Sequence, residues 1–244
     1  MLKKLLQIAS PPIFFSVASK AYIVLGVLGL LLFILSIAYA LISTPIDAQQ
    51  GLVYKVIYVH VPSAWMSMFL YLIGAIYAII FWIWRTDVSA VMMRSVLPTG
   101  AWMTILTLVT GSLWGKSTWG TYWVWDARLT TDLLLLFIYL GLIAVANMIE
   151  DEEKTDKALS LMIVFGTFNI PLIYFSVIFW NTLHQGFSLG ATSASVSPEI
   201  KIALFLCSAS FWLICFSIVL LRAKGLLISR QSTANWPSKI LGNN

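Results

Sequence analysis

The chain has 244 residues, of which 60% are hydrophobic and only 10% are charged, and its formal net charge is +5. Soluble domains carry about 25% charged residues, so the composition excludes an ordinary soluble protein and indicates an integral membrane protein. The positive charge does not indicate a nucleic-acid partner, because the basic residues are spread along the chain and form no groove interleaved with aromatic residues.

The first part of the chain resembles a secretory signal, with lysines at positions 3 and 4 before an apolar run and Ala-Tyr-Ala at 38–40 in the place of a cleavage site. A Pro-Pro pair at 11–12 interrupts this segment, and the apolar run from Ala21 is longer than the roughly 7–15 residues of a signal core. We therefore expect this segment to remain as the first membrane helix.

Six stretches of the chain contain no Asp, Glu, Lys or Arg, and a helix that crosses a membrane needs about 20 apolar residues. These stretches run over residues 21–43, 56–84, 95–115, 133–149, 158–180 and 202–221. They are continuously apolar and lack the alternating segments of about ten residues that mark barrel strands. We predict an all-α polytopic membrane protein with six transmembrane helices in a single domain, 1–244. Pro171 is expected to kink the fifth helix.

The distribution of Lys and Arg predicts the orientation, because cytoplasmic loops are enriched in these residues. With both termini cytoplasmic, eleven of the fifteen fall inside: Lys3, Lys4, Lys20, Arg85, Arg94, Lys154, Lys157, Arg222, Lys224, Arg230 and Lys239. Only four fall outside: Lys55, Lys116, Arg128 and Lys201. The segments at about 44–62, 115–131 and 181–200 are therefore expected to face outward.

Several functional classes are excluded by what the sequence lacks. Cys207 and Cys215 are eight residues apart on one predicted helix, about 12 Å along its axis, which is too far for a disulfide. The absence of Cys-x-x-Cys and Cys-x-x-Cys-His argues against a thiol oxidoreductase and a c-type cytochrome. No ionisable side chain lies deep in a predicted span, which argues against an ion pump or a proton-coupled carrier.

Both histidines of the chain, His60 and His184, lie at the outward ends of predicted spans. Each alone would more often be an interfacial hydrogen-bonding residue. As the only two, at one depth on the same side, they are candidates for the two axial ligands of a haem iron.

The segment 114–128, between the third and fourth helices, contains four of the eleven tryptophans: Trp114, Trp119, Trp123 and Trp125. An aromatic belt at the membrane interface is one interpretation. A belt scatters its rings over helix ends, however, whereas these crowd into one compact loop with two glycines. We therefore favour a flat apolar platform for a porphyrin.

Charged residues within the same segment suit the propionate edge of a haem. Arg128 can pair with a propionate through a bidentate fork, and Lys116 as a point charge. Asp126 is expected either to anchor Arg128 or to cap the fourth helix, where Thr130 and Thr131 are competing caps.

The pattern of Trp114-Gly115 through Trp119-Gly120, followed by Trp123-x-Trp125-Asp126, resembles the tryptophan-rich motif of the haem-handling proteins of cytochrome c biogenesis. The flanking histidines match, as do Gln50-Gly51 and the run from Trp180 to Gly186. The length and the six spans are similar to those of the haem exporter protein C family, CcmC. The larger relatives that attach haem to the apocytochrome carry more spans and further membrane histidines. Tyr122 departs slightly from the motif, where another large aromatic such as Trp is expected.

The resemblance implies that His60 and His184 ligate b-type haem (iron protoporphyrin IX) at the periplasmic face of the bacterial inner membrane. It implies that the Trp-rich loop holds the outer face of the haem, and that haem passes covalently to a periplasmic haem chaperone. The implied partners are that chaperone, ABC transporter subunits of the maturation system and a small single-span helper protein. Conventional enzyme activity is not implied, although the chain is expected to assist attachment of haem to the chaperone.

Two other functions use some of the same features. A membrane electron-transfer subunit of the cytochrome b kind also pairs histidines, but it usually holds two haems in series and needs four histidines within its spans. A scaffold without haem would use the tryptophans only to dock a partner, and it would be colourless when purified.

Overall fold

The computed structural model describes residues 10–180, 182–184 and 196–241, and this part of the chain is helical without a strand. The main helices are α2 (Pro11–Ser43), α3 (Ile57–Trp84), α4 (Asp87–Trp119), α5 (Ala127–Met148), α6 (Glu152–Gly166), α7 (Asn169–Phe179) and α8 (Pro198–Arg230). A short 3-10 helix η1 (Leu52–Val56) precedes α3, and α9 (Asn235–Leu241) follows α8. The predicted all-helical fold is confirmed.

Six helical segments of the described chain are long and apolar enough to cross a membrane: α2, η1 with α3, α4, α5, α6 with α7, and α8. The third and the last span extend well beyond their uncharged stretches, to 87–119 and 198–230. Helical hydrogen bonding does not stop where the apolar residues stop, so charged residues occupy the outer turns. The prediction of six membrane helices is therefore confirmed, with longer spans than the apolar stretches indicate.

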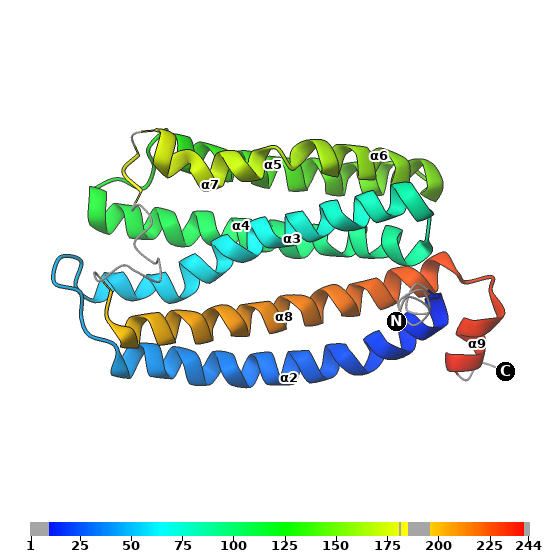
Figure 1. Cartoon of the computed structure of the whole chain (residues 1–244), viewed down its shortest axis with the longest axis horizontal. Helices are drawn as coiled ribbons and strands as arrows, with labels where there is room; N and C mark the ends of the chain where they lie inside the picture. Colours follow the sequence, from blue (N-terminus) through cyan, green and yellow to red (C-terminus); the bar gives the residue numbers. More distant parts are fainter. Residues whose placement is uncertain (1–9, 181, 185–195, 242–244) are drawn as a thin grey trace.

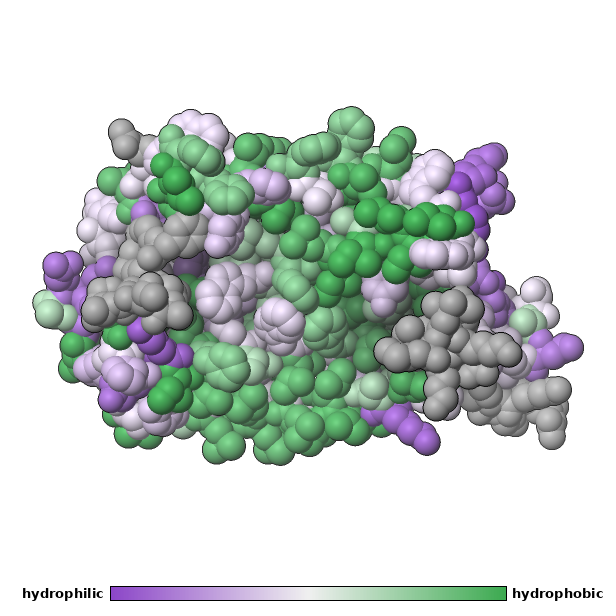
Figure 2. Space-filling model, in the orientation of Figure 1, coloured by the Kyte–Doolittle hydropathy of each residue, from purple (hydrophilic) through white to green (hydrophobic). Residues whose placement is uncertain are grey.

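The helices run side by side along the long axis of the molecule (Figure 1). α2 packs on α8 at one side, α5 packs on α6 and α7 at the other, and α3 and α4 lie between them. Apolar side chains cover the middle of the face shown in Figure 2, and polar ones gather towards its two ends. This distribution suits a bundle whose middle lies in lipid.

The fifth span is interrupted near Pro171, where a kink was expected. α6 ends at Gly166 and α7 begins at Asn169. Proline has no N–H for a bond to the residue four positions earlier, and the carbonyl of Thr167 instead accepts a hydrogen bond from the Ile170 N–H at 3.0 Å. The hydroxyl of Tyr71 on α3 donates to the Ile163 carbonyl at 3.1 Å and ties the interrupted span to the bundle.

A network of charged residues joins α4, α6 and α8 at the end of the bundle where α8 ends (Figure 1). Asp156 is fully buried and accepts hydrogen bonds from Arg94 and Arg230, both at 2.6 Å. Arg230 also contacts Asp87 at 2.7 Å. These pairs fix three helix ends at one end of the bundle, and the histidines lie at the other.

Candidate functional site

His60 lies in the first turn of α3 and is 7% exposed. Its Nδ1 lies 3.1 Å from the Thr110 hydroxyl oxygen on α4. Gly111, the next residue, lies against the ring, because a Cβ built there would come within 2.9 Å of His60 Cε1. The indole of Trp114 meets the imidazole edge-on, with centroids 5.6 Å apart. Three contacts from α4 therefore hold His60 in place.

Trp114 is itself held in position by the segment before α3. Its indole N–H donates to the side-chain oxygen of Gln50 at 2.6 Å, and its ring lies edge-on to Tyr54. Gly51, with a φ of 60°, adopts a left-handed backbone at this turn, which glycine tolerates without strain. The turn thus connects the start of α3 to the end of α4.

His184 is held in a different way, from a non-helical segment after α7. One oxygen of Asp126 accepts a hydrogen bond from the Leu129 N–H at 2.8 Å and caps α5, and the other accepts the hydroxyl of Thr182. The Thr182 oxygen in turn accepts the His184 N–H at 3.0 Å. Of the candidate caps, Asp126 is the one that caps α5, and it also anchors the segment that carries His184.

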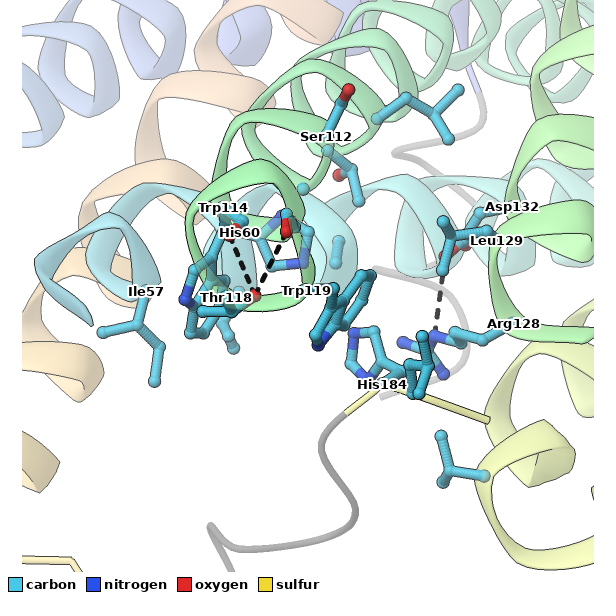
Figure 3. Close-up of a pocket in the computed structure, with 18 of the residues that line it drawn as sticks. Ile57, His60, Ser112, Trp114, Thr118, Trp119, Arg128, Leu129, Asp132 and His184 are labelled. Carbon is cyan, nitrogen blue, oxygen red and sulfur yellow. Dashed lines mark hydrogen bonds and ion pairs between the residues drawn. The ribbon is translucent and has the colours of Figure 1, made fainter. Parts of the chain in front are cut away.

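The two imidazoles face one cavity at the end of the bundle. Their ring centroids are 6.3 Å apart with an angle of 37° between the planes. The cavity has a volume of about 430 Å³, within the range of about 300–1,000 Å³ for ligand pockets. Figure 3 shows His60, Trp119 and His184 around the same opening, with Arg128 beside His184.

The tryptophans are divided between helix, loop and surface. α4 continues to Trp119 and ends at Gly120, whose φ of 77° is the left-handed conformation common at helix ends. Trp114 and Trp119 therefore project from a helix, and the loop is shorter than the segment 114–128 suggested. Trp123 joins them in the cavity wall. Trp125 does not line this cavity: it is 78% exposed, and its ring lies edge-on to that of Trp123.

The two cations of the segment also differ in position. Arg128 lines the cavity, where its Nη1 donates to the Ile173 carbonyl at 2.7 Å and its Nε lies 3.5 Å from a carboxylate oxygen of Asp132. Lys116 lies outside the cavity wall, donates to the Gly120 carbonyl at 3.0 Å and sits over the Tyr122 ring. Of the two, only Arg128 can meet a ligand in the cavity without moving far.

Some of the residues around the cavity were not anticipated from the sequence. Thr107, Gly111, Gly115 and Thr118 line it from α4, and Asp132 lines it from α5. The signal in the sequence was the spacing: 107, 111, 115 and 118 recur at intervals of four and three, which places them on one face of a helix. Small and polar residues on one face of a membrane helix mark a face turned away from lipid.

Comparison with known proteins agrees with the motif. The family model described as Heme exporter protein C matches residues 4–238. The protein of that name from Escherichia coli strain K12 is 34% identical over 241 residues, which cover 99% of this chain and 98% of the relative. The one from Bradyrhizobium diazoefficiens is 34% identical over 228 residues, 93% of this chain and 86% of the relative. A putative cytochrome c biosynthesis ccmC-like mitochondrial protein from Marchantia polymorpha is 41% identical over 185 residues, 76% of this chain and 78% of its own.

Proposed function

The chain belongs to the haem exporter protein C family, and from this we propose that it binds b-type haem through His60 and His184 at the periplasmic face of the bacterial inner membrane and delivers it to a periplasmic haem chaperone. Family membership itself gives the chain a role in haem handling for cytochrome c maturation. The proposal adds the ligands, the side of the membrane and the recipient.

The observation that carries the proposal is the separation of the two imidazoles. A metal lies about 2.0–2.1 Å from an imidazole nitrogen, so two nitrogens on opposite sides of one metal are about 4 Å apart. The ring centroids lie further back than the nitrogens, and the observed 6.3 Å between the centroids of His60 and His184 is the spacing that such a pair requires. The two residues are 124 positions apart in the chain (184 − 60), so local structure does not impose this spacing.

The cavity wall also offers contacts for the apolar ring and the polar edge of a porphyrin. Trp114, Trp119 and Trp123 offer apolar ring surface. Arg128 offers a guanidinium for a propionate. The indole N–H of Trp123 is buried and has no hydrogen-bond partner in the part of the chain that the structure describes, so it is a second donor for a polar group of the cargo.

In this role the chain's residues bind and orient the haem, which is cargo. His60 and His184 hold the iron from its two faces, and the tryptophans cover the ring while leaving an open side. The surface around Trp125 is exposed next to this opening and is the natural contact for the chaperone. ABC transporter subunits and a single-span helper complete the proposed complex within the membrane.

Absorption spectra of the purified protein test the proposal. Wild type expressed with a haem precursor should show a six-coordinate low-spin spectrum, and His60→Ala and His184→Ala should each lose it. Arg128→Ala should retain haem but load the chaperone less, because a lost propionate pair disturbs orientation more than occupancy. Unchanged bands in the His60→Ala, His184→Ala double variant would refute the ligand assignment, and colourless wild-type protein would favour the scaffold without haem.

The cytochrome b alternative is tested with the same preparation. An electron-transfer subunit should show haem that quinol reduces at a rate compatible with turnover, whereas a haem-delivery protein should lose its haem to the purified chaperone. Covalent haem on the chaperone, measured on a haem-stained gel, distinguishes the two.

A further inference from the structure

We propose that Thr110 is a positioning residue that fixes the tautomer of His60, so that Nδ1 carries the proton and the lone pair of Nε2 is available to the haem iron. The inference rests on the proposed function only in taking His60 as an iron ligand. It assigns a role to a threonine that lies outside the tryptophan-rich segment and 50 residues from its partner in the chain.

The direction of the hydrogen bond follows from the other contacts of the Thr110 hydroxyl. Its oxygen lies 2.6 Å from the Leu106 carbonyl and 3.2 Å from the Thr107 carbonyl. Carbonyl oxygens only accept, so the single hydroxyl proton is directed at them. The oxygen therefore meets His60 Nδ1, at 3.1 Å, with a lone pair, and His60 must donate.

A neutral imidazole has one N–H and one lone pair, and the hydrogen bond made by one nitrogen decides the role of the other. With the proton on Nδ1, Nε2 is the basic nitrogen. The ring has little freedom to turn, since Gly111 lies against Cε1 and Trp114 meets the ring edge-on. Partners of this kind commonly orient metal-bound histidines, and their loss typically lowers metal affinity about 10- to 100-fold.

Removal of the hydroxyl oxygen should therefore weaken haem binding without touching a ligand. Thr110→Val keeps the shape and removes the hydroxyl acceptor of the buried Nδ1–H of His60. Thr110→Ser restores the acceptor. Thr104→Val is the matched control, because Thr104 lies on the same helix, is fully buried and makes the same bond to the carbonyl four residues earlier, at 2.8 Å from Gly100.

The tautomer can be read directly in protein without haem. The chain contains only two histidines, so the imidazole nitrogens of ¹⁵N-histidine-labelled protein give few signals, and His184→Gln assigns those of His60. We expect wild-type His60 to be protonated on Nδ1, and Thr110→Val to shift it towards the Nε2–H form. Thr110→Ser and Thr104→Val should keep the wild-type pattern.

Titration with hemin is the second measurement. Thr110→Val should bind hemin at least tenfold more weakly and show an increased high-spin fraction, whereas Thr110→Ser and Thr104→Val should match wild type. Wild-type His60 protonated on Nε2, or Thr110→Val binding within twofold of wild type, would overturn the inference. If the proposed function itself is wrong, His60→Ala should leave the low-spin spectrum unchanged, and this result distinguishes that failure from a failure of the role of Thr110.

Discussion

Gly111 lies against the His60 ring, and Gly111→Ala tests how accurately this proposed iron ligand must be held. A Cβ at residue 111 would lie 2.9 Å from His60 Cε1, whereas ordinary contact begins at 3.4 Å. The ring must therefore retreat by at least about 0.5 Å, which is the tolerance within which binding constellations are typically held. It cannot yield by bending, because an imidazole is rigid, and the Thr110 and Trp114 contacts restrain it.

The expected magnitude follows from the cost of overpacking. Inserting a methyl group into a packed site costs typically about 1–3 kcal/mol, and each 1.4 kcal/mol is tenfold in affinity, so hemin should bind about 5- to 140-fold more weakly. Gly141→Ala is the matched control, because Gly141 also lies within a helix, α5, but has no atom within 4 Å of the added Cβ. It should bind hemin as wild type does.

The assay is titration of protein without haem by hemin, with the low-spin absorbance bands as the signal. Thermal unfolding of the same preparations shows whether Gly111→Ala is folded as well as Gly141→Ala. Equal hemin affinities for the two variants would refute the reasoning, since the added methyl group would then have been accommodated without displacing the ligand.

Three further predictions concern transfer, stability and orientation. Replacing both Trp119 and Trp123 by Ala removes aromatic surface from the cavity, and full burial of a large apolar side chain contributes about 1.5–3 kcal/mol. The variant should purify with some haem but load the chaperone poorly. Normal loading on a haem-stained gel would restore the aromatic-belt interpretation. Arg230→Gln removes one of the two guanidinium partners of buried Asp156. Thermal unfolding should show a loss of stability smaller than the roughly 3–5 kcal/mol that breaking a buried ion pair outright costs, because Arg94 remains. The haem spectrum should not change, because the proposed haem site lies at the other end of the bundle. An impermeant thiol reagent added to intact cells should label cysteines introduced at Gly51, Ser117 and Ser193, the last outside the described residues. It should not label a cysteine at Lys154, an exposed residue of the opposite side that stands in for buried Thr155; the reverse pattern would invert the orientation.

The two histidines could be predicted as a pair from the sequence because the membrane restricts where polar residues lie. An imidazole at the end of an apolar stretch has a known depth, and two at one depth on one side can meet. The sequence did not indicate what holds each ring. The contact between His60 and Thr110 and the one between Asp126 and Thr182 join residues 50 and 56 positions apart, and no local pattern encodes such pairs.

The surroundings of the individual tryptophans also could not be predicted from the sequence, although these residues lie close together in the chain. Residue composition identified the cluster, but composition does not distinguish Trp123 from Trp125. Both residues lie in the non-helical stretch before α5, where no regular spacing predicts which side chain faces the cavity. Trp123 lines the cavity, while Trp125 is 78% exposed. The end of α4 was likewise misplaced, because Trp and Ser are compatible with either helix or loop and only the left-handed Gly120 ends the helix.

The two proposed ligands are held by different kinds of segment, one helical and one non-helical, and this asymmetry bears on the proposed release of haem. Displacing His60 requires moving a ring packed against α4. His184 lies on a non-helical segment, which the hydrogen bonds from Asp126 through Thr182 connect to the start of α5. We expect that weakening this connection loosens His184 from the iron.

Asp126→Asn tests this asymmetry. In Asp126 the Leu129 N–H and the Thr182 hydroxyl donate to different carboxylate oxygens, and asparagine replaces one of these oxygens with an NH₂ donor, so in this geometry one of the two bonds is lost. Hydrogen bonds to charged groups contribute about 1.5–3 kcal/mol, so His184 should leave the iron roughly tenfold or more faster. Carbon monoxide binds ferrous haem only after an axial histidine leaves, and its binding rate in stopped flow should rise accordingly. Asp151→Asn is the control, because Asp151 caps α6 through the Lys154 N–H at 3.0 Å, far from the cavity. Equal carbon monoxide rates in wild type and Asp126→Asn would mean that this tether does not hold His184 on the iron.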